Sequence, residues 1–294
     1  VTSELVQRPE FGIIDYTGSS AFGCWIEEHA PHASIFAEKA GVNCAVIDGT
    51  DNLKGMTGNF AFALSLYSGQ MCTTTQNIFI SGDGIDTDQG HLAFDDAAAA
   101  IVKAVDAFLS EPARAAEVLG AIQNPATVAR IEQARSEGGT ILRESHHLEH
   151  PKFPHARVHS PLILQVDASD THLWLREMFG PIVYIVKTES TAQSIELAAR
   201  CAREEGSITF AVHSKDEDVL DRSERVLTGA GVPVSCNLTG HIFVNQSAAF
   251  SDYHVSGTNP AGNASLCNAG FVTPRFGIVQ SRVPVAAEAA HAGV

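Results

Sequence analysis

Apolar and polar positions along the chain alternate between two patterns. Short apolar runs predict buried strands over residues 11–16, 34–39, 42–47, 76–81, 140–142, 161–166, 181–187, 207–212 and 241–245. Longer segments with helical spacing predict helices over residues 21–29, 52–67, 92–109, 125–136, 191–204 and 217–227. Because strands that alternate with helices build parallel sheets, we expect an α/β fold with a largely parallel sheet flanked by helices.

Two segments depart from this pattern. Residues 144–160 are rich in histidine and proline, which predicts an irregular exposed loop. The histidine spacings match no zinc motif and no cysteine joins them, so we predict no metal site. Residues 246–294 are rich in Gly, Asn, Ser and Ala and predict a C-terminal return segment and tail.

Composition narrows the class of partner. The 294 residues carry a formal charge of -15, which disfavours nucleic acid and anionic membrane surfaces as partners. The six cysteines show no C-x-x-C pair, so thiols in a reducing cytoplasm fit better than a disulfide scaffold. No apolar run approaches the ~20 residues of a membrane span, and the N-terminus lacks signal-peptide features.

Cys72 has unusual surroundings among the cysteines. It lies in the string SGQMCTTT, at a junction between a predicted helix and a predicted strand. Glycine and hydroxyl residues at such a junction leave backbone N–H groups exposed. These groups can hold a thiolate and stabilise an oxyanion formed by attack on a carbonyl. We therefore predict that Cys72 is a nucleophile.

A nucleophile of this kind needs a proton acceptor, and two kinds of residue qualify. Glu38 ends an extended apolar run, and partial desolvation there suits a carboxylate that acts as a general base. A histidine such as His254 would serve instead in a cysteine hydrolase or acyltransferase. Local chemistry leaves both open.

Four strings together resemble the motifs of one enzyme family. GQMCTTTQN (69–77) resembles the nucleophile motif of the aldehyde dehydrogenase superfamily, and EMFGPIV (177–183) resembles its E-x-F-G-P motif. DYTGSSAFG (15–23) is similar to the F-T-G-S turn, and EKAGVN (38–43) is similar to the general-base motif. The ending over residues 243–264 is similar to PaaN-type proteins of phenylacetate catabolism.

The resemblance implies a reaction. Cys72 would attack an aldehyde to give a thiohemiacetal, a hydride would pass to NAD or NADP, and water activated by Glu38 would hydrolyse the thioester. The substrate implied is an aldehyde, and the PaaN-type ending implies a ring-opened CoA semialdehyde. Family members commonly form homo-oligomers, so self-association is expected.

The resemblance also assigns cofactor contacts. Glu177 would bond the nicotinamide ribose hydroxyls, Phe179 would orient the ring, and Gly18 and Ser19 would approach the pyrophosphate. One departure is Asn77, which stands where the family often has arginine.

Family members place most of the dinucleotide domain upstream of the F-T-G-S turn. We therefore expect residues 1–39 to be the last segment of that domain, a remnant of its Rossmann-like fold, and residues 40–245 to be the catalytic domain. The chain resembles the C-terminal half of a longer enzyme and is expected to bind cofactor poorly and to be nearly inactive alone. A cysteine hydrolase or acyltransferase, and a non-catalytic assembly fragment, are the alternatives.

Overall fold

A mostly parallel sheet forms the centre of the molecule. The computed structural model describes residues 2–39, 41–239 and 281–282. Within these residues the sheet has the strand order β15-β14-β13-β3-β5-β12-β11-β8, and only β8 runs antiparallel to its neighbour. The strands are β3 (Asn43–Ile47), β5 (Thr75–Ser81), β8 (Thr140–Arg143), β11 (Leu162–Asp167), β12 (Ile182–Thr188), β13 (Phe210–His213), β14 (Val234–Cys236) and β15 (Ser281–Arg282). The α/β prediction is confirmed.

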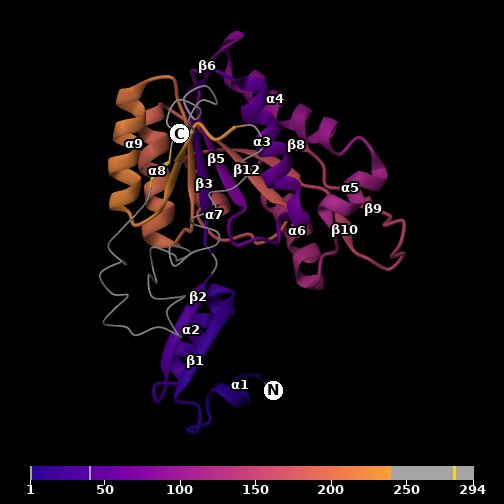
Figure 1. Cartoon of the computed structure of the whole chain (residues 1–294), viewed down its shortest axis with the longest axis vertical. Helices are drawn as coiled ribbons and strands as arrows, with labels where there is room; N and C mark the ends of the chain where they lie inside the picture. The colour runs from indigo at the N-terminus through magenta and orange to yellow at the C-terminus, as the bar shows by residue number, and fades with distance from the viewer. Residues whose placement is uncertain (1, 40, 240–280, 283–294) are drawn as a thin grey trace, which may run out of the picture.

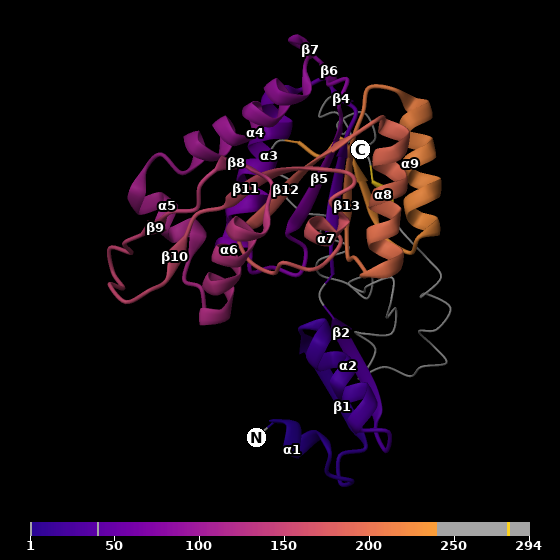
Figure 2. The same cartoon turned by 180° about the vertical axis from the view of Figure 1, so that it is seen from behind.

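Helices cover both faces of this sheet (Figures 1 and 2). Side chains alternate along β3, so that Cys44 and Val46 join one apolar cluster while Ala45 and Ile47 join the other. The helices are α3 (Leu53–Ser65) and α4 (Phe94–Phe108) on the second cluster, and α6 (Pro125–Glu137), α7 (Thr171–Trp174), α8 (Thr191–Glu204) and α9 (Glu217–Gly229) on the first. No helix among the described residues is both long and apolar enough to cross a membrane.

A small parallel unit precedes the sheet and lies at one end of the molecule, in indigo in Figure 1. Its strands β1 and β2 pair in parallel, with a helix between them, over a small core of Ile14, Ile26 and Ala30. Its elements are α1 (Thr2–Val6), β1 (Ile13–Gly18), α2 (Ser20–His29) and β2 (Ser34–Lys39). The shorter elements elsewhere are β4 (Gly49–Thr50), η1 (Leu66–Gly69), β6 (Ile85–Thr87), β7 (Gly90–Leu92), α5 (Pro112–Leu119), β9 (His147–Leu148) and β10 (Val158–His159).

Several predicted elements need correction, among them the strand predicted over residues 11–16, which is Ile13–Gly18. The helix predicted over residues 52–67 ends at Ser65, because the backbone turns left-handed at Tyr67 and Ser68. The strand predicted over residues 207–212 begins only at Phe210, because the N–H groups before it bond a side chain instead of a strand. The strand predicted over 241–245, His254, the 243–264 string and all of 246–294 except residues 281–282 lie outside the described residues.

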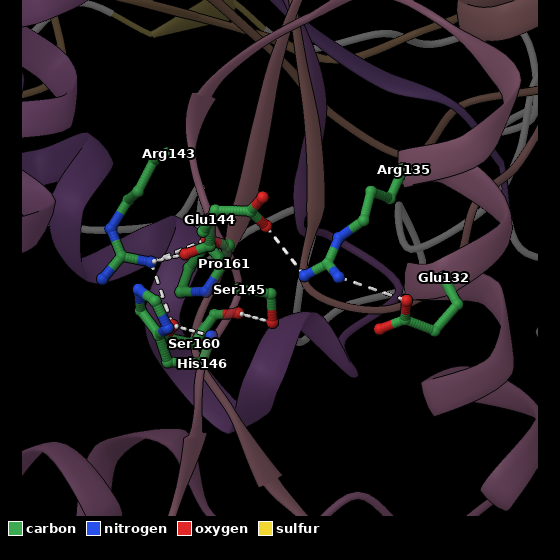
Figure 3. Close-up of polar contacts among 8 residues, drawn as sticks. All are labelled: Glu132, Arg135, Arg143, Glu144, Ser145, His146, Ser160 and Pro161. Carbon is green, nitrogen blue, oxygen red and sulfur yellow. Dashed lines mark hydrogen bonds and ion pairs between the residues drawn. The ribbon is translucent and has the colours of Figure 1, made fainter.

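Arg143 fastens the ends of the 144–160 segment to the antiparallel edge of the sheet (Figure 3). Its Nε donates to Asp106 at 2.8 Å, and one terminal nitrogen donates to the hydroxyl of Ser160 at 2.9 Å and the carbonyl of Pro161 at 2.7 Å. Of the histidines in between, His147 and His159 contact through their rings, with centroids 5.4 Å apart. In the part of the chain that the structure describes, no group of three or more His, Cys, Asp or Glu side chains could hold a metal ion.

His213, at the carboxyl end of β13, is 1% exposed and packs against the ring of Phe60, with ring centroids 5.5 Å apart. Neither ring nitrogen has a hydrogen-bond partner among the described residues. Burial lowers the pKa of His213 from 6.5 to about 4, because a charged imidazole is poorly solvated there. The folded state therefore keeps this side chain neutral.

This burial predicts a loss of stability in mild acid. The unfolded chain binds a proton at His213 near pH 6.5 and the folded chain only near pH 4, so stability present above pH 6.5 falls as the pH decreases between these values. Between pH 7 and pH 5 the free energy of unfolding should fall by about 2 kcal/mol more in the wild type than in a His213→Leu variant. Urea denaturation at both pH values measures this, and equal losses would contradict it. Replacing the exposed His155 with Leu is the control.

Candidate active site

The turn before Cys72 is left-handed over three consecutive residues. Tyr67 and Ser68 both have φ of 52°, and Gly69 has φ of 66°. This conformation costs roughly 1–2 kcal/mol for each residue that carries a Cβ, so surrounding contacts must hold it. The buried hydroxyl of Ser68 contributes, since it lies 3.0 Å from the carbonyl oxygens of both Leu119 and His159.

Gly69 and Gly180 bring the two most specific motifs into direct backbone contact. A Cβ at position 69 would collide with the carbonyl oxygen of Gly180 and the peptide that follows it. Gly180 itself has φ of 140°, a conformation that favours glycine. The nucleophile turn and the EMFGP loop therefore pack as one unit.

Side-chain amides hold the same unit together. Gln70 donates to the carbonyls of Tyr67 at 2.8 Å and Ala121 at 3.1 Å. Gln76 donates to the carbonyl of Arg176 at 2.9 Å and accepts from the N–H of Met178 at 2.6 Å, so it fixes the residues on either side of Glu177. Gln70 thereby bonds the carbonyl of Ala121, and Gln76 bonds the groups beside Glu177, none of which lies in a helix or strand.

A cavity of about 760 Å³ lies beside the nucleophile turn and the EMFGP loop. It separates them from the small β1–α2–β2 unit. The six residues predicted for catalysis and cofactor binding all line it: Gly18, Ser19, Glu38, Cys72, Glu177 and Phe179. No histidine is among the described residues that line it. The structure thus brings together in one cavity residues that lie up to 161 positions apart in the sequence.

The small unit contributes a helix N-terminus and a carboxylate. Ser19 caps α2, where its hydroxyl accepts from the N–H of Phe22 at 3.4 Å, so the positive end of the helix lies at the cavity. Glu38 lies near the carboxyl end of β2, pairs in register with Thr17, and is 5% exposed. A helix N-terminus suits an anion, and a largely buried carboxylate suits proton transfer.

Glu177 has a strongly shifted proton affinity. Burial raises its pKa to about 7, and the charge of Glu205 contributes to the increase, while the guanidinium of Arg130 opposes it. Arg130 also donates to the carbonyl oxygen of Phe179, and both Arg130 and Glu205 line the cavity. Sequence reasoning missed these two residues, because only the folding of α6 and α8 brings them to the EMFGP loop.

Asn77, the departure from the family motif, faces away from solvent. It is 0% exposed, and its amide donates to the carbonyl of Trp174 at 2.9 Å. This position therefore fastens β5 to the segment that leads into the EMFGP loop.

Comparison with known proteins identifies the family. The chain belongs to the aldehyde dehydrogenase family, whose model matches residues 1–266. Among solved structures, an NAD-dependent aldehyde dehydrogenase from Burkholderia multivorans is 50% identical, with a TM-score of 0.85 over 93% of this chain and 49% of that one.

Curated relatives are more distant. Chloroplastic betaine aldehyde dehydrogenase of Beta vulgaris is 25% identical over 79% of this chain and 45% of that protein. The 1-pyrroline-5-carboxylate dehydrogenase of Bacillus subtilis (strain 168) is 23% identical over 87% of this chain and 48% of its own length. The chain thus spans less than half the length of these relatives.

The contact between Gly69 and Gly180 predicts a large effect of one methyl group. Gly69→Ala should lower the free energy of unfolding by at least about 2 kcal/mol, since it adds both left-handed strain and a backbone collision. It should also slow alkylation of Cys72 by iodoacetamide, because the turn must move. Denaturation and peptide-resolved mass spectrometry measure both effects.

Gly58→Ala is the matched control, because a Cβ there meets nothing within 4 Å and position 58 lies inside α3. It should be neutral or stabilising. A Gly69→Ala chain that behaves like Gly58→Ala would show that the close approach is unimportant.

Proposed function

We propose that this chain carries the catalytic residues of an NAD- or NADP-dependent aldehyde dehydrogenase, which oxidises an aldehyde to a carboxylate. The observation that carries the proposal is the single cavity in which Cys72, Glu38, Glu177 and Phe179 meet. Family membership and the 50% identity to an NAD-dependent aldehyde dehydrogenase support it. A cysteine hydrolase would give no role to Gly18, Ser19, Glu177 and Phe179, which line the same cavity as Cys72.

In this proposal Cys72 performs the covalent chemistry. Its sulfur attacks the carbonyl carbon of the aldehyde, the new S–C bond forms, and the carbonyl electron pair moves to oxygen beside the backbone N–H of Cys72. NAD or NADP, when bound beside Phe179, would supply the hydride acceptor that this oxidation to the thioester requires. Glu38 then takes a proton from water, the water oxygen attacks the thioester carbon, and the Cys72 thiolate leaves.

The residues at the cavity fit a dinucleotide. The N-terminus of α2 at Ser19 offers backbone N–H groups for a pyrophosphate, and Gly18 has no side chain to obstruct it. Glu177 offers an acceptor for ribose hydroxyls, and Phe179 offers an aromatic face for the nicotinamide. We propose accordingly that residues 1–39 belong to the cofactor-binding region and residues 40–245 to the catalytic domain.

For the substrate, we propose a ring-opened CoA semialdehyde of phenylacetate catabolism, in a cytoplasmic homo-oligomer. This part rests on the string over residues 243–264, which resembles PaaN-type proteins. Comparing the rate of reduction of NAD or NADP with such a semialdehyde and with simple aldehydes tests it. An unselective rate would contradict it while leaving aldehyde oxidation intact.

Glu38→Gln tests the assignment of the base. With aldehyde and cofactor supplied under conditions in which the wild type turns over, the variant should stop after one turnover and retain an acyl group on Cys72, because water is no longer activated. Intact-mass spectrometry should show the trapped thioester, and steady-state reduction of the cofactor should fall by about 10²–10⁴-fold.

The matched control is Glu28→Gln, an acid-to-amide change at an exposed position on α2. It should turn over normally. Unimpaired turnover in Glu38→Gln would contradict the role of Glu38, and formation of an acyl adduct in a Cys72→Ser variant would contradict the role of Cys72.

The raised pKa of Glu177 predicts pH-dependent cofactor binding. Only the carboxylate is a strong acceptor for ribose hydroxyls, and with a pKa of about 7 it protonates as the pH falls from 8 to 6. Cofactor affinity should therefore weaken by up to about tenfold over that range. Calorimetry measures it.

Two variants test whether Glu177 causes the pH dependence of cofactor affinity and whether Glu205 raises its midpoint. Glu177→Gln should bind weakly and without this pH dependence. Glu205→Gln should keep the dependence but move its midpoint to lower pH, because a like charge near Glu177 is removed. A wild-type affinity that is constant between pH 6 and pH 8 would contradict the prediction.

A further inference from the structure

Asn43 connects three segments behind the nucleophile. It is the first residue of β3 and is 1% exposed. Its side-chain Nδ2 donates to the carbonyl oxygens of Cys72 at 2.7 Å and Thr74 at 3.2 Å. Its Oδ1 accepts from the backbone N–H groups of Ile208 at 2.9 Å and Thr209 at 3.1 Å. The amide thus uses both of its donors and both lone pairs of its acceptor.

The sheet is irregular at this point. The side chain of Asn43 therefore makes hydrogen bonds to backbone groups that strand pairing would make in a regular sheet. The pairing of β3 with β5 shifts register between Asn43 and Cys44. Strand β13 pairs with β3 only from Ala211, and Ile208 and Thr209 precede the first residue of β13, Phe210. Buried backbone groups left over by such an irregularity need other partners, and the amide of Asn43 supplies them on both sides.

We propose that Asn43 is a positioning residue for the nucleophile. The hydrogen bond to the carbonyl of Cys72 fixes the peptide plane that follows the nucleophile, and the bond to Thr74 fixes the next turn of the backbone. The two N–H groups that bond Oδ1 prevent the amide from rotating away. The orientation of Cys72, and of the backbone N–H beside its sulfur, is thereby set by β3 and by the segment before β13.

This inference rests on the proposed role of Cys72 as nucleophile, but its test needs neither aldehyde nor cofactor. The readout is the rate at which iodoacetamide alkylates Cys72, followed by peptide-resolved mass spectrometry across a range of pH. Cys24 is exposed on α2 and serves as an internal reference in the same molecule. The ratio of the two rates reports reactivity at Cys72 independently of reagent and protein concentration.

Two variants at position 43 should lower that ratio. Asn43→Ala removes all four bonds, and Asn43→Asp keeps the acceptor for Ile208 and Thr209 while it places a carboxylate oxygen against the carbonyls of Cys72 and Thr74. We expect the Cys72-to-Cys24 ratio to fall by at least about tenfold in both, with the pH midpoint of Cys72 alkylation displaced. If Asn43→Ala fails to fold, Asn43→Asp decides the matter.

Asn237→Gly is the matched control, because the amide of Asn237 also donates and accepts at 3.0 Å, with the carbonyl and N–H of Ser214. Its φ of 52° suits glycine, so the change removes the amide without strain. It should lower thermal stability and leave the alkylation ratio within about twofold. An unchanged ratio in folded Asn43→Ala or Asn43→Asp would overturn the proposal, whether or not the chain oxidises aldehydes.

Discussion

The backbone contact between Gly69 and Gly180 is the constraint on which the geometry of the cavity depends. Neither position accommodates a residue with a side chain in its present conformation. A Cβ at position 69 would collide with the carbonyl oxygen of Gly180, and Gly180 has a positive φ. Because of this contact, the segment that carries Cys72 and the segment that carries Glu177 cannot move independently. Arg130 adds a hydrogen bond to the EMFGP loop at the carbonyl of Phe179.

The side-chain amides of Asn43, Gln70 and Gln76 add hydrogen bonds that hold the same region in place. The cavity lies at the amino ends of β3, β5 and β12, whereas ligands of parallel α/β sheets usually lie beyond the carboxyl ends. Connections that enter strands here leave carbonyl and N–H groups without ladder partners. Asn43 bonds such groups on two segments, at Cys72 and at Ile208. Gln70 bonds the carbonyl of Ala121 and the N–H of Gln123, and Gln76 bonds the groups on either side of Glu177. These side-chain hydrogen bonds therefore help to fix a site that is built on irregular backbone.

The sequence predicted the layers of the fold better than the details of the turns. The helix over residues 191–204 agrees at both ends with α8, because its apolar face repeats with helical period and Ser190 caps it. Tyr67 and Ser68 carry no signal for a left-handed turn, since distant carbonyls stabilise it. Motifs indicated six residues of the cavity, but Arg130 and Glu205 become neighbours of Glu177 only through packing.

The distribution of charge around the cavity agrees with the proposed places of the cofactor pyrophosphate, the ribose hydroxyls and the attacking water. Three carboxylates, those of Glu38, Glu177 and Glu205, line it, and among the described lining residues Arg130 is the only cation. An anionic pyrophosphate would be repelled by most of this surface, so the N-terminus of α2 is the favourable place for it. The carboxylates suit the uncharged parts of the reaction, hydroxyl groups and water. In the proposed site a formal charge of -15 is therefore compatible with an anionic cofactor, because the N-terminus of one helix would attract the pyrophosphate where most of the lining side chains would not.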